Sequence, residues 1–314
     1  MSTIDVIGLG ALNTDRIYLA SRTLDDDEAV VAEAGSFPGG SAANTIYGLA
    51  KLGITTGFVG ALGGDAEGKE MLADFDKVGV DTGQIIIKRG VKTGSTLCFS
   101  AGSEKRSLYV IPGANNRLTM DDIDSGYLNQ AKVLHVSSFA DDRQFLLLLE
   151  LVDELTAKVS FSPGALYTRK GLKALAPILA KTHLLFLNEA EIQQLSGKDF
   201  AAAAETCLGY GCRIVVVTLG KGVGYKNVMA TAYIRDGDNE YVVEPAGQTR
   251  AQDTTGAGDA FATGFLYGFV KGKGLKECGQ LGDIVARFSV GKIGARAGLP
   301  AAAELSRRYH KLYG

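Results

Sequence analysis

Short apolar runs alternate with longer amphipathic stretches along most of the chain. The apolar runs predict buried strands, because short runs bounded by turn signals suit strands that are covered on both faces. They are Ile4 to Gly10, Thr55 to Leu62, Val133 to Ser137, Val159 to Ser162, Leu184 to Leu187 and Ile214 to Thr218. Apolar residues at helical spacing predict the helices Ser41 to Leu52, Glu67 to Val78, Gln144 to Thr156, Leu172 to Lys181, Glu189 to Leu195, Ala201 to Leu208, Gly258 to Lys271 and Leu275 to Ile293. This alternation predicts an α/β fold with a mainly parallel sheet between two layers of helices.

Two segments near the N-terminus lack helical periodicity. Residues 16–37 mix polar and β-prone residues with an acidic run, and predict exposed strands and a loop that forms a flap. Residues 93–111 predict a hairpin with a turn at Gly102-Ser103-Glu104. The last third predicts strands at Gly222 to Ile234 and Glu240 to Glu244, and a short helix from Ala301. We therefore expect one domain, 1–314, with a small β element formed by insertions at about 14–36 and 93–112.

The composition is that of an ordinary globular protein. Of the 314 residues, 46% are hydrophobic and 22% are charged, and the formal net charge is −2, so no overall field attracts nucleic acid or an anionic membrane. The four cysteines are scattered and favour single buried thiols. With neither a signal peptide nor an apolar stretch long enough to span a membrane, the sequence predicts a cytoplasmic protein.

The glycine-rich segment Asp253-Thr-Thr-Gly-Ala-Gly-Asp259 leads directly into a predicted helix. Small residues at a helix start leave backbone N–H groups pointing outward, and the helix dipole adds positive potential, which suits a phosphate. Asp259, in the first turn, is placed to accept the proton of an attacking hydroxyl while those N–H groups hold the transferred phosphate. The spacing fits equally well a glycine-rich helix cap in which Asp259 only complements the dipole.

Two further clusters carry polar side chains suited to a hydroxylated ligand. Gly39 and Gly40 precede a helix whose first turn holds Asn44, and an amide offers both a donor and an acceptor to a sugar hydroxyl. Asn13 and Asp15 follow the first strand, at the edge of the sheet where open α/β folds bind ligands. Taken singly, each cluster also fits an ordinary turn or cap.

Two clusters after later strands are candidates for the nucleotide side. In Asn188-Glu-Ala-Glu191, the carboxylate of Glu191 is a candidate magnesium ligand, because magnesium favours few carboxylates together with phosphate oxygens. Capping of the following helix is the alternative. The run Thr218-Leu-Gly-Lys-Gly-Val-Gly224 fits either a loop around a nucleotide or a tight turn.

Two partial motifs and the histidines are set aside. Residues 63–70 approach a Walker A loop, but Glu70 stands where a magnesium-binding Ser or Thr is needed. Gly8 and Gly10 begin a dinucleotide fingerprint whose third glycine position is Asn13. The three histidines lack metal-ligand spacing, so a histidine-based zinc site is not expected.

Taken in order, these clusters resemble the ribokinase-like (PfkB) family of carbohydrate kinases. The segment Asp253 to Asp259 with Ala260-Phe261 resembles the C-terminal signature of the family. Residues 39–53 followed by 59–68 resemble the N-terminal one. Gly113-Ala-Asn-Asn116, Asn188 with Glu191, and Thr218-Leu-Gly220 also stand in family order. The resemblance covers essentially the whole chain and implies a three-layer α/β/α sandwich with a small β-sheet lid, often a dimer interface.

The resemblance also implies roles for the candidate residues. Asp259 is the base, the backbone of Gly256, Ala257 and Gly258 is the anion hole, and the acceptor contacts Asn13, Asp15, Gly39, Gly40 and Asn44. Magnesium and the ATP phosphates are organised by Asn188 and Glu191, and the nucleotide lies near Thr218, Gly220 and Gly222. A monovalent cation, potassium, is implied at Asp253 near Gly294.

The acceptor itself stays open between a small sugar and a nucleoside. Ser41 stands where ribokinases often carry lysine, and Ser138-Phe139 where they often carry an acidic residue. Leu184 to Asn188 and residues 271–282 are similar to archaeal nucleoside kinases of the family. A rival of another class, a non-catalytic ligand sensor, predicts a missing base or a broken anion hole, and both are intact here.

Overall fold

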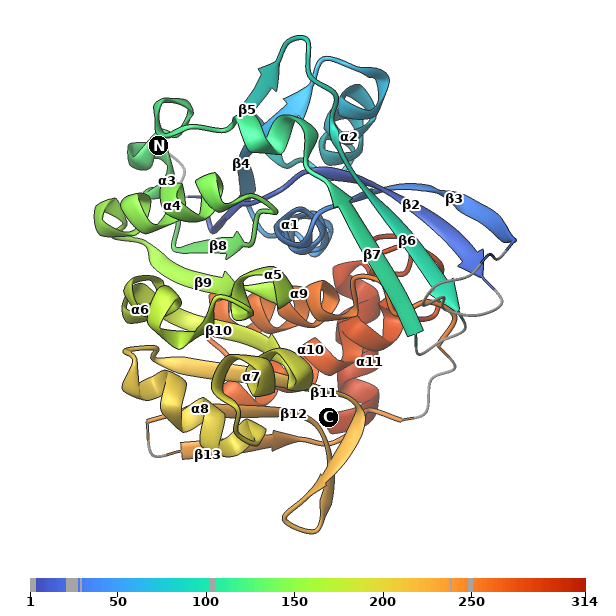
Figure 1. Ribbon diagram of the computed structural model, residues 1–314. Helices are drawn as coiled ribbons and strands as arrows, with labels where there is room; N and C mark the ends of the chain where they lie inside the picture. Colours follow the sequence, from blue (N-terminus) through green and yellow to red (C-terminus); the bar gives the residue numbers. More distant parts are fainter. Residues whose placement is uncertain (1–3, 21–27, 29, 102–104, 238, 248–250) are drawn as a thin grey trace.

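The computed structural model describes residues 4–20, 28, 30–101, 105–237, 239–247 and 251–314. Within these ranges a nine-stranded sheet forms the centre of the molecule (Figure 1). Its strands, in spatial order, are β13 (Asn239–Val243), β12 (Val228–Asp236), β11 (Ile214–Tyr225), β10 (Thr182–Asn188), β9 (Lys158–Ser162), β8 (Val133–Ser137), β1 (Val6–Leu9), β4 (Thr56–Gly63) and β5 (Asp81–Lys88). The strands from β5 to β11 are parallel, and β12 and β13 are antiparallel additions at one edge.

Helices cover both faces of this sheet. The α-helices are α1 (Ser41–Lys51), α2 (Ala66–Asp76), α3 (Ser125–Leu128), α4 (Asp142–Leu151), α5 (Gly164–Thr168), α6 (Gly171–Lys181), α7 (Glu189–Ser196), α8 (Phe200–Gly209), α9 (Ala257–Val270), α10 (Leu275–Ser289) and α11 (Ala302–Tyr313). Short 3-10 helices lie at Gly113–Arg117, Met120–Asp122 and Val152–Glu154. The predicted three-layer α/β/α architecture with a mainly parallel sheet is confirmed.

Alternate residues of each central strand enter two different cores. Ile7, Leu185 and Val215 pack into the core beneath α4 to α8. The residues next to them in the sequence, such as Val6 and Val216, face the other side of the sheet. They pack into the opposite core with residues of α1, α9 and α10. Because side chains of a strand alternate between its faces, a strand covered on both sides must be apolar at almost every position. This requirement explains why the continuous apolar runs located these strands correctly.

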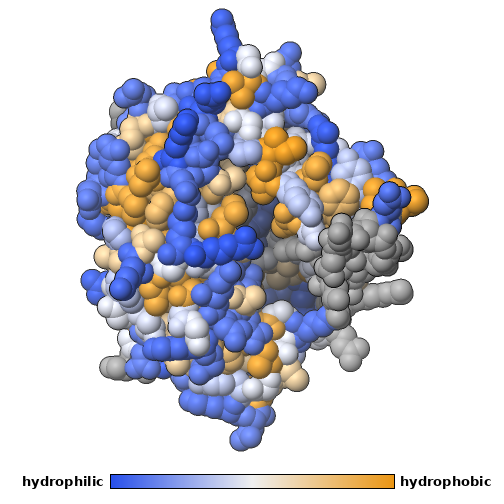
Figure 2. Space-filling view, viewed as in Figure 1, coloured by the Kyte–Doolittle hydropathy of each residue, from blue (hydrophilic) through white to orange (hydrophobic). Residues whose placement is uncertain are grey.

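The β element near the N-terminus is a separate four-stranded sheet, which we call the lid sheet. Its order is β3 (Val31–Gly39), β2 (Asn13–Ala20), β6 (Gly94–Ala101) and β7 (Lys105–Ile111). It projects from one side of the main body (Figure 1), and Figure 2 shows that face hollowed beside it. The hairpin predicted at 93–111 is confirmed as β6 and β7, which pair antiparallel. The turn at 102–104 and the flap residues 21–27 and 29 lie outside the described residues.

Several predicted boundaries were wrong. The single strand predicted at Gly222 to Ile234 is the end of β11, a turn at Lys226 and Asn227 with φ of 46° and 67°, and then β12. The edge strand β5 was missed because most of its residues are exposed or half-buried and give no continuous apolar run. The helix predicted to Ile293 ends at Ser289, and the helix predicted at Gln144 to Thr156 passes into a 3-10 turn after Leu151.

His135 is a buried titratable group in the middle of the sheet. Its Nδ1 lies 2.9 Å from Ser160 Oγ across the β8–β9 pair, and its Nε2 has no hydrogen-bond partner among the described residues. Burial lowers its pKa from 6.5 to about 3. Between pH 6.5 and about pH 3, the imidazole is protonated in the unfolded chain but stays neutral in the folded chain. This histidine therefore lowers the free energy of unfolding as the pH falls through that range.

We expect His135→Gln to flatten the pH dependence of stability. In the wild-type chain this histidine removes roughly 1.4 kcal/mol of unfolding free energy per pH unit below 6.5. The measurement is urea unfolding at several pH values between 7 and 4. His310→Gln, which changes an exposed histidine of α11, is the control. Equal slopes for the His135→Gln and wild-type proteins would contradict the prediction.

Candidate functional site

Candidate residues gather at the carboxyl edge of the parallel sheet. The chain order changes direction at β1, which pairs with β4 on one side and with β8 on the other. Open α/β sheets bind ligands beyond the carboxyl ends of the strands at such a switch point. Residues 10–13 leave β1 there, Ser137 ends β8, and Asn188 ends β10. In the next strand Thr218 lies beside Asn188 in register, so two predicted nucleotide-side residues are neighbours.

Asp259 lies where the N-terminal ends of α1 and α9 meet. It occupies the first turn of α9, and its carboxylate accepts hydrogen bonds from two residues of α1. Ser41 Oγ donates to Oδ1 at 2.6 Å, and Asn44 Nδ2 donates to Oδ2 at 2.9 Å. Two accepted bonds suit an ionised carboxylate, whose oxygens only accept hydrogen bonds. Asn44 and Asp259, which are 215 positions apart in the sequence, are therefore joined by a hydrogen bond.

Two threonines fasten α1 to α9 one turn below the carboxylate. Thr45 Oγ1 donates to the Asp259 carbonyl at 3.3 Å, and Thr263 Oγ1 donates to the Thr45 carbonyl at 3.3 Å. Gly48 allows this approach, since a Cβ there would lie 2.7 Å from Thr263 Cγ2. Both helix N-termini consequently point toward one region, and their dipoles add positive potential beside the carboxylate.

The turn before α9 has the geometry of an anion-binding helix start. Gly256 caps the helix with φ 72° and no side-chain cap, and a Cβ there would lie 2.4 Å from Ala295 Cβ. Only glycine accepts both the left-handed backbone and this close approach. The Ala257 N–H donates to the Thr254 carbonyl at 3.2 Å. Within the described part of the chain, no partner is recorded for the N–H groups of Gly256 and Gly258.

The predicted acceptor residues Asn13, Asp15 and Gly39 lie together on the lid sheet. Asn13 pairs with Gly39 on one side and with Gly94 on the other. The Asp15 carboxylate lies against Gly39, where a Cβ would come within 2.1 Å of its Oδ2. Gly40, with φ 102°, turns the chain from this sheet into α1. Gly39 and Gly40 thus bring the end of the lid sheet, where Asn13 pairs with Gly39, next to the helix α1 that holds Asn44.

Asn115 was known from sequence only as part of a family-like run, and its structural role was missed. It is buried, and its side chain holds Leu12, between β1 and β2, together with Asn13, the first residue of β2. Its Oδ1 accepts from the Leu12 N–H at 2.9 Å, and its Nδ2 donates to the Leu12 carbonyl at 3.0 Å and to Asn13 Oδ1 at 2.9 Å. Asn115 therefore fixes the orientation of the Asn13 amide.

Arg296 was not predicted at all, although it contacts two predicted acceptor-side residues. Its side chain is 7% exposed. Nε donates to Asn44 Oδ1 at 2.9 Å, Nη1 donates to Asp74 Oδ2 at 2.7 Å, and Nη2 donates to the Gly39 carbonyl at 3.4 Å. Burial lowers the pKa of Arg296, while the charge of Asp74 acts against that change. Arginine is rarely buried, so composition and spacing gave no sign of this position.

The predicted cation residues also have structural roles. Asn188 and Glu191 form a reciprocal cap for α7: Asn188 N–H donates to Glu191 Oε2 at 2.9 Å, and Glu191 N–H donates to Asn188 Oδ1 at 2.8 Å. Asp253 accepts the N–H groups of Thr255 and Gly294, both at 2.9 Å. It thereby joins the segment before α9 to the loop that follows α10. Within the described ranges, no three His, Cys, Asp or Glu side chains gather as a metal site.

The predicted nucleotide-side residues Thr218, Gly220 and Gly222 lie where the regular pairing of β11 with β12 is interrupted. The pairing of β11 with β12 shifts between Thr218 and Val223. Gly220 and Gly222 lie inside this irregular stretch, with φ of 58° and 113°. The predicted residues thus form two groups, one around Asp259 at the starts of α1 and α9 and the other at the ends of β10 and β11.

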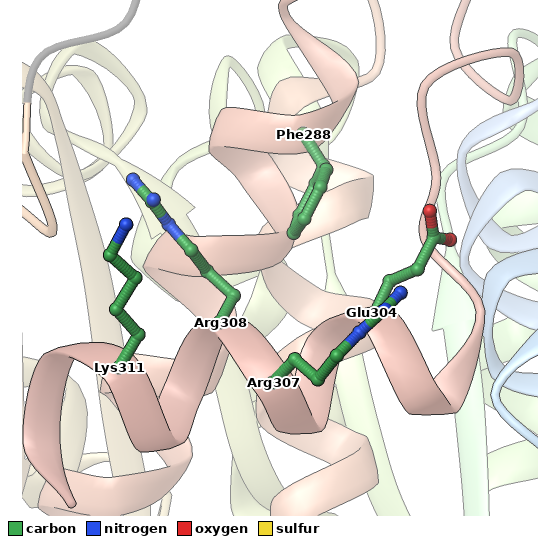
Figure 3. A pocket seen from close by; sticks show the side chains of 5 residues that line it. All are labelled: Phe288, Glu304, Arg307, Arg308 and Lys311. Carbon is green, nitrogen blue, oxygen red and sulfur yellow. The ribbon is translucent and has the colours of Figure 1, made fainter.

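Two surface hollows lie on other elements. One is lined by Phe288 of α10 and by Glu304, Arg307, Arg308 and Lys311 of α11 (Figure 3). The second shares Phe288 and Glu304 and extends to the loop after α10. None of the predicted site residues lines either hollow. No helix in the described part of the chain is long and apolar enough to cross a membrane.

Comparison with known proteins bears on the family and the fold. The model of the pfkB family of carbohydrate kinases matches residues 3–302. A protein of Archaeoglobus fulgidus described as an uncharacterized sugar kinase is 38% identical over 260 residues, which cover 82% of this chain and 100% of that protein. A cytidine kinase of Thermococcus kodakarensis is 31% identical, covering 82% of this chain and 90% of that protein. The structure of a Burkholderia thailandensis nucleoside kinase with inosine superposes with a TM-score of 0.83 at 20% identity, covering 98% and 99% of the two chains.

Proposed function

The chain belongs to the pfkB family of carbohydrate kinases, and on this premise we propose that it transfers the γ-phosphate of ATP to a hydroxyl of a small sugar, with Asp259 as the general base. The observation that carries the proposal is the carboxylate of Asp259, held by Ser41 and Asn44 beside the glycine turn of Gly256. A carboxylate next to an anion-binding helix start suits a reaction in which a proton leaves a hydroxyl as a phosphate arrives.

In the proposed reaction the acceptor lies between the lid sheet and α1. Asn13, Asp15, Gly39, Gly40 and Asn44 hold its hydroxyls, and one hydroxyl points at Asp259. The hydroxyl oxygen attacks the γ-phosphorus in line, the bond to the bridging oxygen of ADP breaks, and the proton passes to the Asp259 carboxylate. The backbone of Gly256, Ala257 and Gly258 forms the anion hole, with the N–H groups of Gly256 and Gly258 as the principal donors because Ala257 N–H already donates to Thr254.

The donor side of the proposed site is formed by Asn188, Thr218, Gly220 and Gly222, with Glu191 holding magnesium. The shared end of β10 and β11 supports this placement, since it brings Asn188 beside Thr218. One carboxylate fits magnesium that keeps water and phosphate oxygens as its other ligands, and the metal would neutralise charge on the phosphates. Potassium is proposed near Asp253, whose carboxylate shapes the loop at Gly294 from which backbone carbonyls would bind the ion.

The lid sheet is proposed to cover the acceptor and to join two copies of the chain. Exposed apolar side chains on β7 support this, because Leu108, Tyr109 and Ile111 are 50%, 61% and 51% exposed. We propose a cytoplasmic location, which is supported by four cysteines that are buried as thiols and not joined in disulfides. Sedimentation velocity tests the dimer, and Tyr109→Lys is expected to shift it toward the monomer.

A nucleoside is the second candidate acceptor, favoured by the identity to a cytidine kinase. ADP release across a panel of sugars, sugar phosphates and nucleosides, with magnesium and with or without potassium, decides between the two. Acceptor-dependent ADP release with sugars is the expected result, and release with nucleosides alone would transfer the proposal to the second candidate. Binding of an acceptor without any ADP release would favour a ligand sensor and contradict the proposed function.

A further inference from the structure

Arg296 stands at the centre of a buried chain of polar contacts that leads to Asp259. It lies in the loop after α10, 252 positions from Asn44 in sequence. The contacts run from Asp74 of α2 through the guanidinium to the amide of Asn44, and from that amide to the carboxylate of Asp259. Arg296 Nη2 also donates a hydrogen bond to the carbonyl of Gly39, the last residue of β3 in the lid sheet.

The chemistry of the two groups on either side of Asn44 admits one orientation of its amide. A guanidinium only donates hydrogen bonds, and an ionised carboxylate only accepts them. Asn44 must therefore present Oδ1 to Arg296 and Nδ2 to Asp259, as the structure has it. If the amide were rotated by half a turn, Oδ1 would face the carboxylate and Nδ2 would face the guanidinium. The hydrogen bonds to Arg296 and Asp259 would both be lost, and groups of like charge or partial charge would face each other.

The surroundings of Arg296 hold it in one position. Its guanidinium carbon lies 5.1 Å from the centre of the Tyr47 ring and 5.2 Å from that of the Phe75 ring. Asp74 supplies the opposite charge that a buried guanidinium needs. The planar group donates to three oxygen atoms and to Met71 Sδ at 3.6 Å, a set of contacts that the single ammonium of a lysine does not reproduce. The orientation of the Asn44 amide thus depends on the Arg296 guanidinium, which is held by contacts with α1, α2 and the lid sheet.

We propose that Arg296 is a positioning residue that acts through Asn44 on the base Asp259 and through Gly39 on the acceptor side of the site. This inference rests on the proposed function. Arg296 itself touches neither the phosphate nor the reacting hydroxyl. It keeps the Asn44 N–H on Asp259 Oδ2 and so holds the carboxylate in the orientation in which it meets the acceptor hydroxyl.

The test is Arg296→Met, measured with the acceptor that the wild-type chain phosphorylates fastest. We expect kcat to fall about 100-fold, because a displaced catalytic group costs that much, while the KM for ATP changes less than about 3-fold. Stability falls as well, because the Asp74 carboxylate loses its nearer charged partner and keeps only Lys77 at 3.8 Å. The double variant Arg296→Met with Asp74→Asn removes that poorly compensated charge, and we expect it to regain stability but not kcat.

Controls separate positioning from folding. Arg287→Met removes an ion pair with Asp283 at 2.6 Å on α10, and kcat is expected to stay near the wild-type value while stability falls. Arg296→Lys keeps the charge without the planar group and is expected to leave most of the kcat defect. If the double variant recovered kcat together with stability, Arg296 would be structural only, and the proposal would be overturned.

A crystal structure of Arg296→Met gives a readout that does not depend on turnover. We expect the Asn44 amide to turn or to leave Asp259 Oδ2. If Asn44 Nδ2 kept its hydrogen bond to Asp259 in the variant, the inference would fail even if the kinase proposal held. If the wild-type chain released no ADP with any acceptor, the kinase proposal would fail, and this crystal structure would still decide the role of Arg296.

Discussion

Asp259→Asn is expected to lower kcat by roughly 10²–10⁴-fold with little change in the KM for ATP, because it removes general-base catalysis and leaves the fold intact. The asparagine side chain keeps an oxygen that accepts from Ser41 or Asn44, but its amide has no basic lone pair for the proton of the acceptor hydroxyl. The measurement is ADP release at saturating acceptor, with product formation followed by mass spectrometry.

Loss of a first-turn carboxylate also weakens a helix start, so a matched variant is needed. Glu277→Gln removes a carboxylate from the first turn of α10, where it pairs with Lys273 at 2.9 Å. We expect this variant to change stability by under about 1 kcal/mol and to keep its kcat. Turnover near the wild-type rate in Asp259→Asn would exclude Asp259 as the base.

The sequence predicted the main sheet and the neighbourhood of Asp259 for physical reasons that can be named. Strands buried on both faces are apolar at almost every position, so runs such as Leu184 to Leu187 were visible without any knowledge of their partners. Parallel strands end at one edge, which is why residues after β1, β10 and β11 were candidates for ligand contacts at that edge. Asn44 and Asp259 were both expected at helix starts that border the ligand, and the structure joins them by a hydrogen bond.

Long-range contacts of polar residues could not be predicted in the same way. Arg296 follows Gly294 in a loop, a setting in which arginine is usually solvated, and its burial depends on Asp74, Tyr47 and Phe75 of distant segments. Ser41 was noted for replacing a lysine that ribokinases often carry, yet its bond to Asp259 required the packing of α1 on α9. Periodicity reports which face a residue occupies, but not which polar partner it finds there.

Gly256→Ala is expected to impair both catalysis and stability. An alanine at φ 72° costs about 1–2 kcal/mol, and its Cβ would lie 2.4 Å from Ala295 Cβ, which forces the turn or the loop of Ala295 to move. Overpacking of this kind adds about 1–3 kcal/mol. The displaced loop carries Gly294, which donates to Asp253, and Arg296, so we expect kcat to fall about 100-fold. Thermal unfolding and ADP release measure the two effects.

Gly272→Ala separates backbone strain from the steric overlap. Gly272 follows the other end of α9 with φ 73°, almost the same backbone angle, but a Cβ there would meet nothing within 4 Å. Its variant should lose only the roughly 1–2 kcal/mol of the left-handed backbone and should keep its kcat. The prediction would be contradicted if Gly256→Ala lost no more stability than Gly272→Ala and kept the wild-type kcat. The close approach of Gly256 to Ala295 would then have no part in holding the anion-binding turn.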